Sequence, residues 1–345
     1  MSEKNARIAA NDLQDFVARL FAASGLQDGQ ARTCAETFLL QEMRGVHHHG
    51  LARLASTLDA LGNGTLNPRP EIRLLRREGA ISLLDADRAP GMLACHEAMS
   101  QAMSSVGGHG IGMAVVRNSS HFLAAAPYCI KATEAGFIGI AFSNSPASMA
   151  YPGARRAVLG NGPFGYAVPQ AGGFPIVFDA AMTVSGGQLI EMSHRGEELP
   201  AALAGLDARG EPTTDPSAIL DGGATLPIGL HKGAGLVLLF ELLTGVLGGG
   251  DFLYSSEGSF SSESQCCIAI RTDAFSSADQ FLDRVTAYVR GIRSAAKSSD
   301  GEALLPGERA HHSLERSLRE GIALDPETAE SLRHQASRLG VAAPF

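Results

Sequence analysis

The stretch Ile111-Gly112-Met113-Ala114-Val115-Val116 is an apolar run of the length expected for a buried β-strand. A helical pattern follows over about Phe122 to Ala135, and a second apolar run, Phe137 to Phe142, comes directly after it. Strands that alternate with helices in this way are typical of α/β proteins. The alternation continues outward, with further strands predicted at Ile81 to Leu84, Gly165 to Val168, Ile176 to Phe178 and Cys267 to Ile270, and a helix from Leu93 to Val106.

Both ends of the chain are predicted to be helical. Apolar residues at helical spacing predict helices from about Asn11 to Phe21, from Asp28 towards Gly45, after Gly50, and from about Glu327 to Leu339. Residues 63–70 are rich in turn formers and are typical of a linker. We therefore expect a helical lobe made of residues 1–70 with about 300–345, and an α/β domain over residues 71–300 with a surface excursion near residues 205–223.

Two segments of the expected α/β domain differ from the rest in composition. Gly235 to Leu247 is apolar nearly all round, which predicts a buried helix that is too short to cross a bilayer. Tyr254 to Gln265 is rich in Ser, Glu and Gly, which is typical of a loop. We expect the first segment in the core and the second at the surface.

Composition restricts the class of protein. The 345 residues are 45% hydrophobic and 19% charged, as in ordinary soluble globular proteins. A net charge of -8 and a pI near 5.8 disfavour nucleic acid as a partner. Five cysteines without a CxxC pattern indicate neither a zinc site nor a disulfide framework, and the first ten residues lack the apolar core of a signal peptide. We expect a cytoplasmic enzyme or binding protein with no membrane partner.

Imidazoles and a guanidinium group lie close together in the sequence between Arg44 and Leu54. If the predicted helix after Gly50 begins at this point, His49 lies on its first turn and Arg53 lies one turn later on the same face. An arginine can hold a substrate carboxylate through two hydrogen bonds, which would place the neighbouring carbon beside the imidazole. The pair therefore suits proton transfer to a 2-oxo or 2-imino acid.

Plainer interpretations of the same residues stay open. His47, His48 and His49 could form a solvated helix entry, or could bind a metal for hydrolytic chemistry with a third ligand from elsewhere. The sequence offers no further motif at metal-ligand spacing, so we assign no metal ligand. A single arginine on a helix is also more often a surface charge than a substrate ligand.

Other candidate site residues occur where predicted strands end. Ser119 or Ser120 can cap the helix that follows residue 121, and His121 would then lie at the positive end of that helix. Asp179 follows a strand and could accept hydrogen bonds from a ribose or from backbone amides. Lys232, among glycines, could reach a phosphate. The literal G-x-G-x-x-G at residues 160–165 should be discounted as a dinucleotide fingerprint, because a strand and not a helix is predicted after it.

Taken in order, these motifs resemble one known family over about residues 10–340. The chain is similar to the malate/L-lactate dehydrogenase-like oxidoreductases, a non-Rossmann group that includes ureidoglycolate dehydrogenase, sulfolactate dehydrogenase, diketogulonate reductase and Δ1-piperideine-2-carboxylate/Δ1-pyrroline-2-carboxylate reductase. It looks most like the last of these, the cyclic imine reductases. The matching segments are residues 44–53, 118–122, 160–163, 179–181, 212–216, 226–229, 232–233 and 306–308.

The resemblance implies an NAD(P)-binding mixed sheet, a helical lobe built from both chain ends, and a homodimer. It implies that His49 donates or accepts the proton, that Arg53 binds the substrate carboxylate with His48 beside it, and that His121 serves catalysis or cofactor contact. Either NAD or NADP would be the cofactor, since no acidic residue can be tied to its ribose. The positions implied for cofactor contact are His121, Ser145, Asp179, Ala180, Ala181, Lys232, Gly307 and Glu308.

Two positions depart from the family pattern. His48 stands where the family has a serine, and Gly162 stands where it has the asparagine of a Gly-Thr-Asn-Pro turn. Two functions follow as alternatives: an NAD(P)-dependent oxidoreductase acting on the C2 carbon of a small 2-oxo, 2-hydroxy or cyclic 2-imino acid, and a degenerate family member that binds a ligand or partner without catalysis.

Overall fold

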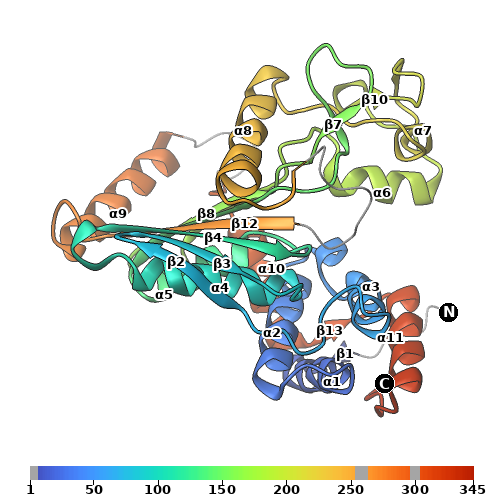
Figure 1. The fold of residues 1–345 in the computed structure, drawn as a ribbon, viewed down its shortest axis with the longest axis horizontal. Helices are drawn as coiled ribbons and strands as arrows, with labels where there is room; N and C mark the ends of the chain where they lie inside the picture. The colour runs from blue at the N-terminus through green and yellow to red at the C-terminus, as the bar shows by residue number, and fades with distance from the viewer. Residues whose placement is uncertain (1–6, 253–262, 296–303) are drawn as a thin grey trace.

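The centre of the computed structural model is a seven-stranded mixed sheet (Figure 1). The structure describes residues 7–252, 263–295 and 304–345. From one edge of the sheet to the other, the strand order is β2-β3-β4-β12-β5-β8-β9. The strands are β2 (Arg73–Glu78), β3 (Ile81–Asp85), β4 (Ile111–Ser119), β12 (Glu263–Arg271), β5 (Phe137–Ser143), β8 (Phe164–Val168) and β9 (Ile176–Ala180).

Helices cover both faces of this sheet, which explains why its central strands are apolar on both sides. In β4, Ala114 and Val116 pack on the face that α4 (Gly91–Ser104) and α5 (Ala126–Glu134) cover, whereas Val115 packs with Phe240 of α8 (His231–Glu241) on the other face. This two-residue alternation is the expected geometry of a strand. The predicted α/β class and the mixed sheet are confirmed.

Helices from the two chain ends pack against each other (Figure 1). The C-terminal helix α11 (Pro326–Leu339) contacts α1 (Ala10–Ala23) and α3 (Leu54–Gly62), and α10 (Glu308–Glu320) contacts α2 (Asp28–Met43). Short strands β1 (Arg7–Ile8) and β13 (Ile322–Ala323) pair antiparallel and join the two ends. The exact division into two domains stays a prediction.

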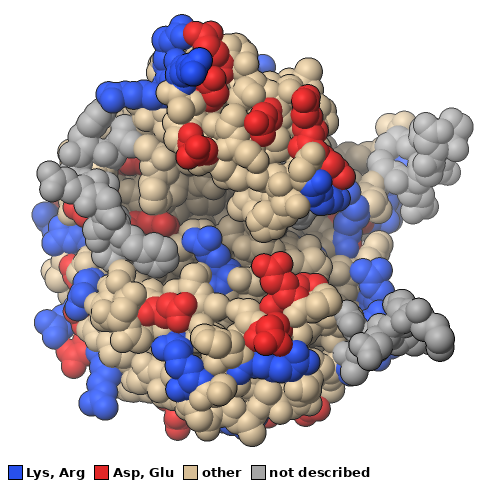
Figure 2. Space-filling view, turned by 90° about the vertical axis from the view of Figure 1, so that its right-hand side faces the viewer, with Lys and Arg blue, Asp and Glu red and all other residues tan. Residues whose placement is uncertain are grey.

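A third part of the structure lies beyond the α8 face of the sheet (Figure 1). Figure 2 shows that the molecular surface is hollowed between this part and the chain-end helices. Its elements are β6 (Met149–Ala150), β7 (Ala157–Leu159), α6 (Gly186–Arg195), β10 (Gly205–Leu206), β11 (Pro212–Thr213) and α7 (Pro216–Leu220). The predicted surface excursion near residues 205–223 corresponds to β10, β11 and α7.

Several predicted boundaries are wrong. β4 continues to Ser119, and α5 begins only at Ala126, so residues 120–125 form a loop and the helix starts four residues later than the expected Phe122. The segment 47–53 forms two short 3-10 turns, His47–His49 and Leu51–Arg53, with Gly50 between them. His49 therefore does not lie on the first turn of an α-helix, because α3 starts after Arg53.

The predicted buried helix at residues 235–247 is also corrected. α8 is followed by a π-helical turn, Leu242–Leu247, and only one side of this unit faces the sheet. Leu239 and Leu247 on the other side are 48% and 72% exposed. The predicted loop over Tyr254 to Gln265 lies mostly outside the described residues, but its last three residues begin β12. The last helix of the sheet domain is α9 (Ala278–Ala295).

Among the described residues, no helix combines the length and the apolar character that a membrane span requires.

Candidate active site

The carboxyl ends of several strands meet at one edge of the sheet. β4 and β5 both pair antiparallel with β12 and are therefore parallel to each other, and β9 runs in the same direction, since β8 separates it from β5. His121 follows the end of β4, Ser145 follows the end of β5, and Asp179 to Ala181 end and follow β9. In open α/β sheets, ligands bind at this edge. The fold thus brings together residues that are far apart in the sequence.

A buried carboxylate shapes the segment that carries His48, His49 and Arg53. Glu42, near the end of α2, accepts a hydrogen bond from the Leu51 backbone N–H at 2.9 Å and pairs with Nδ1 of His47 at 2.5 Å. A Cβ atom at Gly50 would lie 2.3 Å from Oε2 of Glu42. The glycine therefore allows the chain to fold tightly over the carboxylate, and sequence reasoning had missed Glu42.

Three imidazole rings lie in succession. The ring centroids of His48 and His49 are 4.4 Å apart, and those of His49 and His121 are 5.3 Å apart. Nδ1 of His121 accepts a hydrogen bond from the Leu123 backbone N–H at 3.1 Å, which places the ring proton of a neutral His121 on Nε2. His121 therefore presents a donor on the side of the ring away from its own loop.

Arg53 is the cation that acts on these imidazoles. Burial is the main cause that lowers the pKa of His49 to about 3, and the charges of His48 and Arg53 contribute in the same direction. Burial also lowers the pKa of His121 well below its usual range, with Arg53 as the next cause. Both rings are therefore neutral at pH 7. The i, i+4 helical spacing that led to the pairing of His49 and Arg53 is absent, but the folded chain still brings the two side chains together.

Asp179 caps the helix after the His121 loop from outside that helix. Its carboxylate accepts hydrogen bonds from the backbone N–H groups of Ala125 and Ala126, at 3.3 and 2.8 Å. Surrounding protein raises the pKa of Asp179 to about 6, while these amides and the charge of Arg44 act in the opposite direction. Asp179 keeps part of its surface open to solvent. It therefore holds the loop that carries His121 and still lines open space.

Ser119 and Ser120 do not cap the helix that was predicted to follow them. Ser120 Oγ instead accepts a hydrogen bond from the backbone N–H of Gly91, in the first turn of α4, at 2.9 Å. The extra length of β4 and the later start of α5 separate both serines from that helix. His121 is likewise five residues before Ala126 and does not lie at the positive end of α5.

The three glycines of the G-x-G-x-x-G string are required by packing. A Cβ atom would lie 2.4 Å from the Ser145 backbone oxygen at Gly160, 2.2 Å from Val237 at Gly162, and 2.7 Å from Ala125 at Gly165. Phe164 begins strand β8, so no helix N-terminus follows the string. The predicted strand after the string is confirmed, so the string lacks the helix that a dinucleotide fingerprint requires.

Hydrogen bonds of the Ser145 side chain and of the backbone connect the expected cofactor residues near β5 and β9. Ser145 Oγ donates to Oδ1 of Asn161 at 2.8 Å and accepts from its backbone N–H at 3.0 Å. The N–H of Met182 binds the Asn161 carbonyl at 2.8 Å, and the N–H of Ile228 binds the Met182 carbonyl at 2.9 Å. Ala180 and Ala181, both half-buried, precede Met182. Lys232 lies exposed in the first turn of α8, shortly after Ile228.

Gly307 and Glu308 lie at the other end of β9. A Cβ atom at Gly307 would be 2.8 Å from the Val177 backbone oxygen, and Val177 is near the start of that strand. Glu308 is buried, accepts a hydrogen bond from the Leu305 N–H at 2.7 Å, and forms an ion pair with Arg293. Both carboxylate oxygens of Glu308 are thus already bound by protein groups.

The structure gives no support to the alternative in which His47, His48 and His49 bind a metal. Among the described residues, no group of three His, Cys, Asp or Glu side chains could hold a metal ion.

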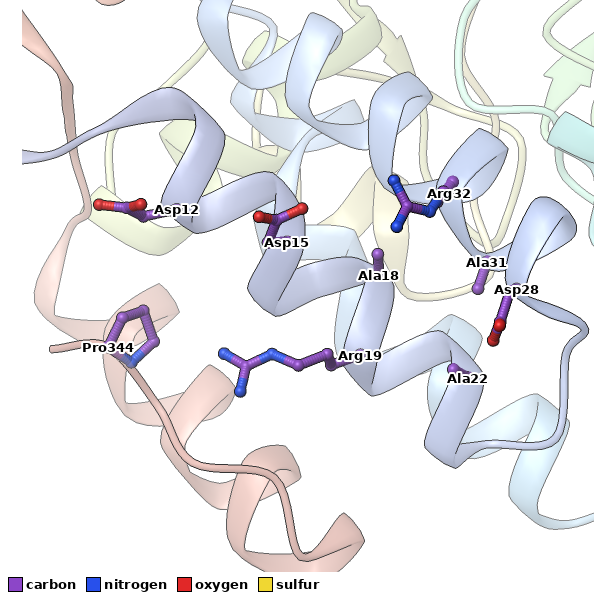
Figure 3. A pocket seen from close by; sticks show the side chains of 9 residues that line it. All are labelled: Asp12, Asp15, Ala18, Arg19, Ala22, Asp28, Ala31, Arg32 and Pro344. Atoms are coloured by element: carbon purple, nitrogen blue, oxygen red, sulfur yellow. The ribbon is translucent and has the colours of Figure 1, made fainter.

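A surface cavity of about 580 Å³ lies between α1, α2 and the C-terminal segment, away from the strand ends described above (Figure 3). It contains none of the imidazoles. Its lining combines three acidic and two basic side chains with small residues: Asp12, Asp15, Asp28, Arg19, Arg32, Ala18, Ala22, Ala31 and Pro344.

Comparison with known proteins identifies the family. The family model described as malate/L-lactate dehydrogenase matches residues 8–333. The chain is 31% identical to malate dehydrogenase of Pyrococcus abyssi, over 99% of this chain and 97% of that protein. It is also 31% identical to Δ1-pyrroline-2-carboxylate/Δ1-piperideine-2-carboxylate reductase of Pseudomonas syringae pv. tomato, over 94% of each chain.

The fold agrees with this relationship. The crystal structure of malate dehydrogenase from Entamoeba histolytica superposes with a TM-score of 0.92 at 25% identity, covering 99% of both chains. The structure thus defines an α/β protein with a seven-stranded mixed sheet, the fold of these dehydrogenases. The chain belongs to the malate/L-lactate dehydrogenase family, whose dehydrogenases use NAD or NADP. Its relatives are named dehydrogenases or reductases, and it is an oxidoreductase of this family.

Proposed function

We propose that the protein transfers hydride between nicotinamide C4 and the C2 carbon of a small 2-oxo or 2-hydroxy acid or a cyclic 2-imino acid. One observation carries the proposal: Arg53 acts on both His49 and His121, and these two imidazoles lie 5.3 Å apart. A cation beside two neutral imidazoles suits a substrate with one carboxylate next to a reacting C–O or C–N bond. The names of the relatives, which include malate dehydrogenase and a cyclic imine reductase, support this range of substrates.

The described residues leave polar atoms available for a bound cofactor. Nδ1 of His49, Oγ of Ser119 and Oγ of Ser185 are buried without a hydrogen-bond partner in the described chain. Buried polar atoms are normally satisfied, so such atoms indicate a position where a bound group completes the structure. Ser185 directly follows the segment Ala180 to Val184, next to which we place the cofactor. Lys232 and the backbone of Ala180 and Ala181 would hold it, and Ser145 and Asp179 would support that surface.

The chain's own groups would act as follows. When bound, the reduced nicotinamide supplies a hydride to C2 of the substrate. Arg53 binds the substrate carboxylate and fixes the position of C2. His49, neutral in the free protein, accepts the proton of a 2-hydroxyl group in the oxidative direction. A carboxylate on Arg53 offsets its positive charge and raises the pKa of His49, so the imidazole can return that proton in the reductive direction.

His121 and His48 would complete the substrate site. The Nε2–H of His121 points away from the Leu123 amide that its Nδ1 accepts from, and it can donate to the substrate oxygen or nitrogen. The ring of His48 contacts the first turn of α6, where a Cβ at Gly187 would lie 2.9 Å from it. His48 thus connects the substrate side to the segment after β9. We assign it to substrate contact, where the family pattern has a serine.

The proposal is tested on one plate that combines 2-oxo acids and cyclic 2-imino acids with NADH and with NADPH. The purified chain should oxidise one reduced cofactor with at least one of these substrates. Arg53→Ala should mainly raise KM, whereas His49→Gln should mainly lower kcat with cofactor binding retained. Arg69→Ala is a control, because Arg69 belongs to no part of the proposed site.

Two results would count against the proposal. Saturable NAD(P)H binding without turnover of any substrate on the plate would favour the non-catalytic alternative. Equal and small effects of the Arg53 and His49 variants on kcat and KM would remove the roles that we assign to them.

A homodimer and a cytoplasmic location also stay proposals. The apolar side of α8 and its π-helical turn, with Leu239 and Leu247 exposed, supports an association of two copies. Light scattering of the purified chain tests the dimer, and a monomer at all concentrations would contradict it.

A further inference from the structure

Glu263 lies beside the proposed site, on the strand that separates β4 from β5. It is the first residue of β12 and stands opposite Ser119 in the register with β4. Between Val116 and Ser119, β4 contains one residue more than β12 does, and Asn118 in this bulge has a φ of 55°. Beyond the bulge, the pairing of β4 with β12 ends at Ser119, immediately before Ser120 and His121. Glu263 is therefore next to the loop that carries His121.

The face of β12 that carries Glu263 can be derived from its neighbours. Side chains alternate along a strand, so Glu263 shares a face with Gln265 and Cys267. Nε2 of Gln265 donates to the backbone oxygen of Ser120 at 3.1 Å. Cys267 packs on the α4 side, where its Sγ is 3.5 Å from that of Cys95. Glu263 is thus on the face that touches the loop before His121.

The carboxyl group of Glu263 is buried, with only 7% of the residue exposed. This burial raises its pKa to about 8, and the charge of Arg53 acts in the opposite direction. Arg53 is the same cation that lowers the pKa of His49 and His121. One guanidinium group therefore acts on two imidazoles and on a carboxyl group that is mainly protonated at pH 7.

The other titratable groups around β12 differ from Glu263 in position or in charge state. His49 and His121 are neutral at pH 7 and stay neutral at higher pH. Burial raises the pKa of the Cys95 thiol on α4 well above its usual range. Glu241 on α8 is also buried, with its pKa raised to about 7, but its hydrogen-bonding neighbour is Asn144. Among these groups in the described part of the chain, Glu263 is the acid whose pKa is raised to about 8 and on which the charge of Arg53 acts.

We propose that Glu263 determines whether Arg53 can bind an anion: the substrate carboxylate binds while Glu263 is protonated, and ionised Glu263 competes with the substrate for the charge of Arg53. The inference rests on the proposed role of Arg53 and adds a residue that controls it. A protonated Glu263 leaves the site with the single positive charge of Arg53, which matches one substrate carboxylate. An ionised Glu263 cancels that charge. Two anions would then face one cation in a poorly solvated place.

The test uses the full-length protein saturated with reduced cofactor, and oxamate as the probe. Oxamate is a monoanionic analogue of a 2-oxo acid that is not itself reduced. Calorimetry between about pH 7 and about pH 9.5 should show affinity falling by up to roughly tenfold per pH unit above the pKa of Glu263. Titrations in two buffers with different ionisation enthalpies should show proton uptake on binding above that pKa, approaching about one proton per oxamate.

Matched variants locate the proton. Glu263→Gln should bind oxamate with an affinity that no longer falls over this range and without proton uptake. Glu241→Gln, which removes a buried acid with a similarly raised pKa, should keep both effects. The proton uptake of the wild-type protein needs no variant, so the inference can be tested even if Glu263→Gln does not fold.

The possible failures can be told apart. No oxamate binding at any pH would count against the proposed function of Arg53. Oxamate binding with no proton uptake in the wild-type protein, or with the same pH dependence in Glu263→Gln, would overturn the role of Glu263 and leave the role of Arg53 standing.

Discussion

The imidazole rings of His49 and His121 lie 5.3 Å apart with an angle of 33° between their planes. His49 comes from the chain-end helical part and His121 from a loop at the carboxyl end of a sheet strand. The contact therefore joins two parts of the fold. Both rings are neutral in the free protein, because burial and the charge of Arg53 lower the pKa of each imidazole.

The first prediction concerns the protonation of His49. In the free protein its pKa is about 3, so 15N spectra of the imidazole should show a neutral ring throughout the range from pH 7 to about pH 5. Oxamate with reduced cofactor should raise that pKa, because its carboxylate offsets Arg53. His49→Gln identifies the resonance. A ring that titrates near pH 6.5 in the free protein would contradict the prediction.

The lowered pKa of His49 also predicts how the unfolding free energy changes as the pH falls. The folded pKa of His49 lies below its unfolded value of 6.5, so the unfolded chain binds the proton more readily. This residue's contribution to stability is present above pH 6.5 and is lost as the pH falls towards 3. The unfolding free energy of His49→Gln should therefore fall less between pH 7 and about pH 5 than that of the wild-type protein. An unchanged pH slope would argue against a buried neutral ring.

A second prediction concerns Gly50. Gly50→Ala places a Cβ atom 2.3 Å from Oε2 of Glu42 and 3.1 Å from its Cα, so the turn that carries His49 must move. We expect a loss of about 1–3 kcal/mol in unfolding free energy and a fall in kcat/KM of roughly 100-fold. Gly29→Ala is the control, since no atom lies within 4 Å of its added Cβ. It should change stability by no more than about 1 kcal/mol and keep activity.

A third prediction concerns Gly162, which replaces the asparagine of the family turn. Its φ of 57° is a conformation that asparagine tolerates, but an added Cβ would lie 2.2 Å from Cγ2 of Val237. Gly162→Asn should therefore destabilise the protein by about 1–3 kcal/mol. In a double-mutant cycle measured by denaturant unfolding, Val237→Ala should relieve part of that cost. Strictly additive effects would mean that Val237 is not what requires glycine here.

A fourth prediction separates the role of Asp179 from general stability. Asp179→Ala removes the acceptor for two amides at the start of α5 and should cost about 1 kcal/mol or more in unfolding free energy. It should also lower kcat/KM, because the loop before α5 contains His121 and loses the hydrogen bonds that hold its end. Asp325→Ala removes the cap of α11, where Asp325 accepts from the Thr328 N–H at 2.8 Å. It should cost similar stability and keep activity. Equal activity of both variants would contradict the positioning role of Asp179.

Much of the sheet could be predicted from the sequence, because its central strands are apolar on both faces. β2 was missed because its residues, Arg73–Glu78, are all exposed and mostly charged, as suits an edge strand. α10 was missed because few of its residues are buried, so its sequence has too few apolar residues at helical spacing to predict a helix. The apolar segment at residues 235–247 was assigned to the core, since composition shows hydrophobicity and not which side of a helix has a neighbour.

For the candidate site, the sequence supplied the residue types and their family positions. It supplied His49, Arg53, His121 and Asp179 as candidates, but the pairing of His49 with Arg53 was derived from a helix that starts only after Arg53. Glu263 was assigned to a polar loop, because Ser and Glu around it hide the start of a strand. Glu42 was not considered, because nothing in the sequence next to a glutamate within a helix shows that its carboxylate is buried.

The sequence by itself determined the α/β class, most of the central strands and the membership of a family, because periodicity and motifs are local properties of the chain. Only the tertiary structure decided which ionisable side chains lie near one another. Arg53, His121 and Glu263 belong to three distant segments, and the register between β4 and β12 brings the last two together. Their protonation depends on burial and on distances through space, which residue spacing along the chain does not fix.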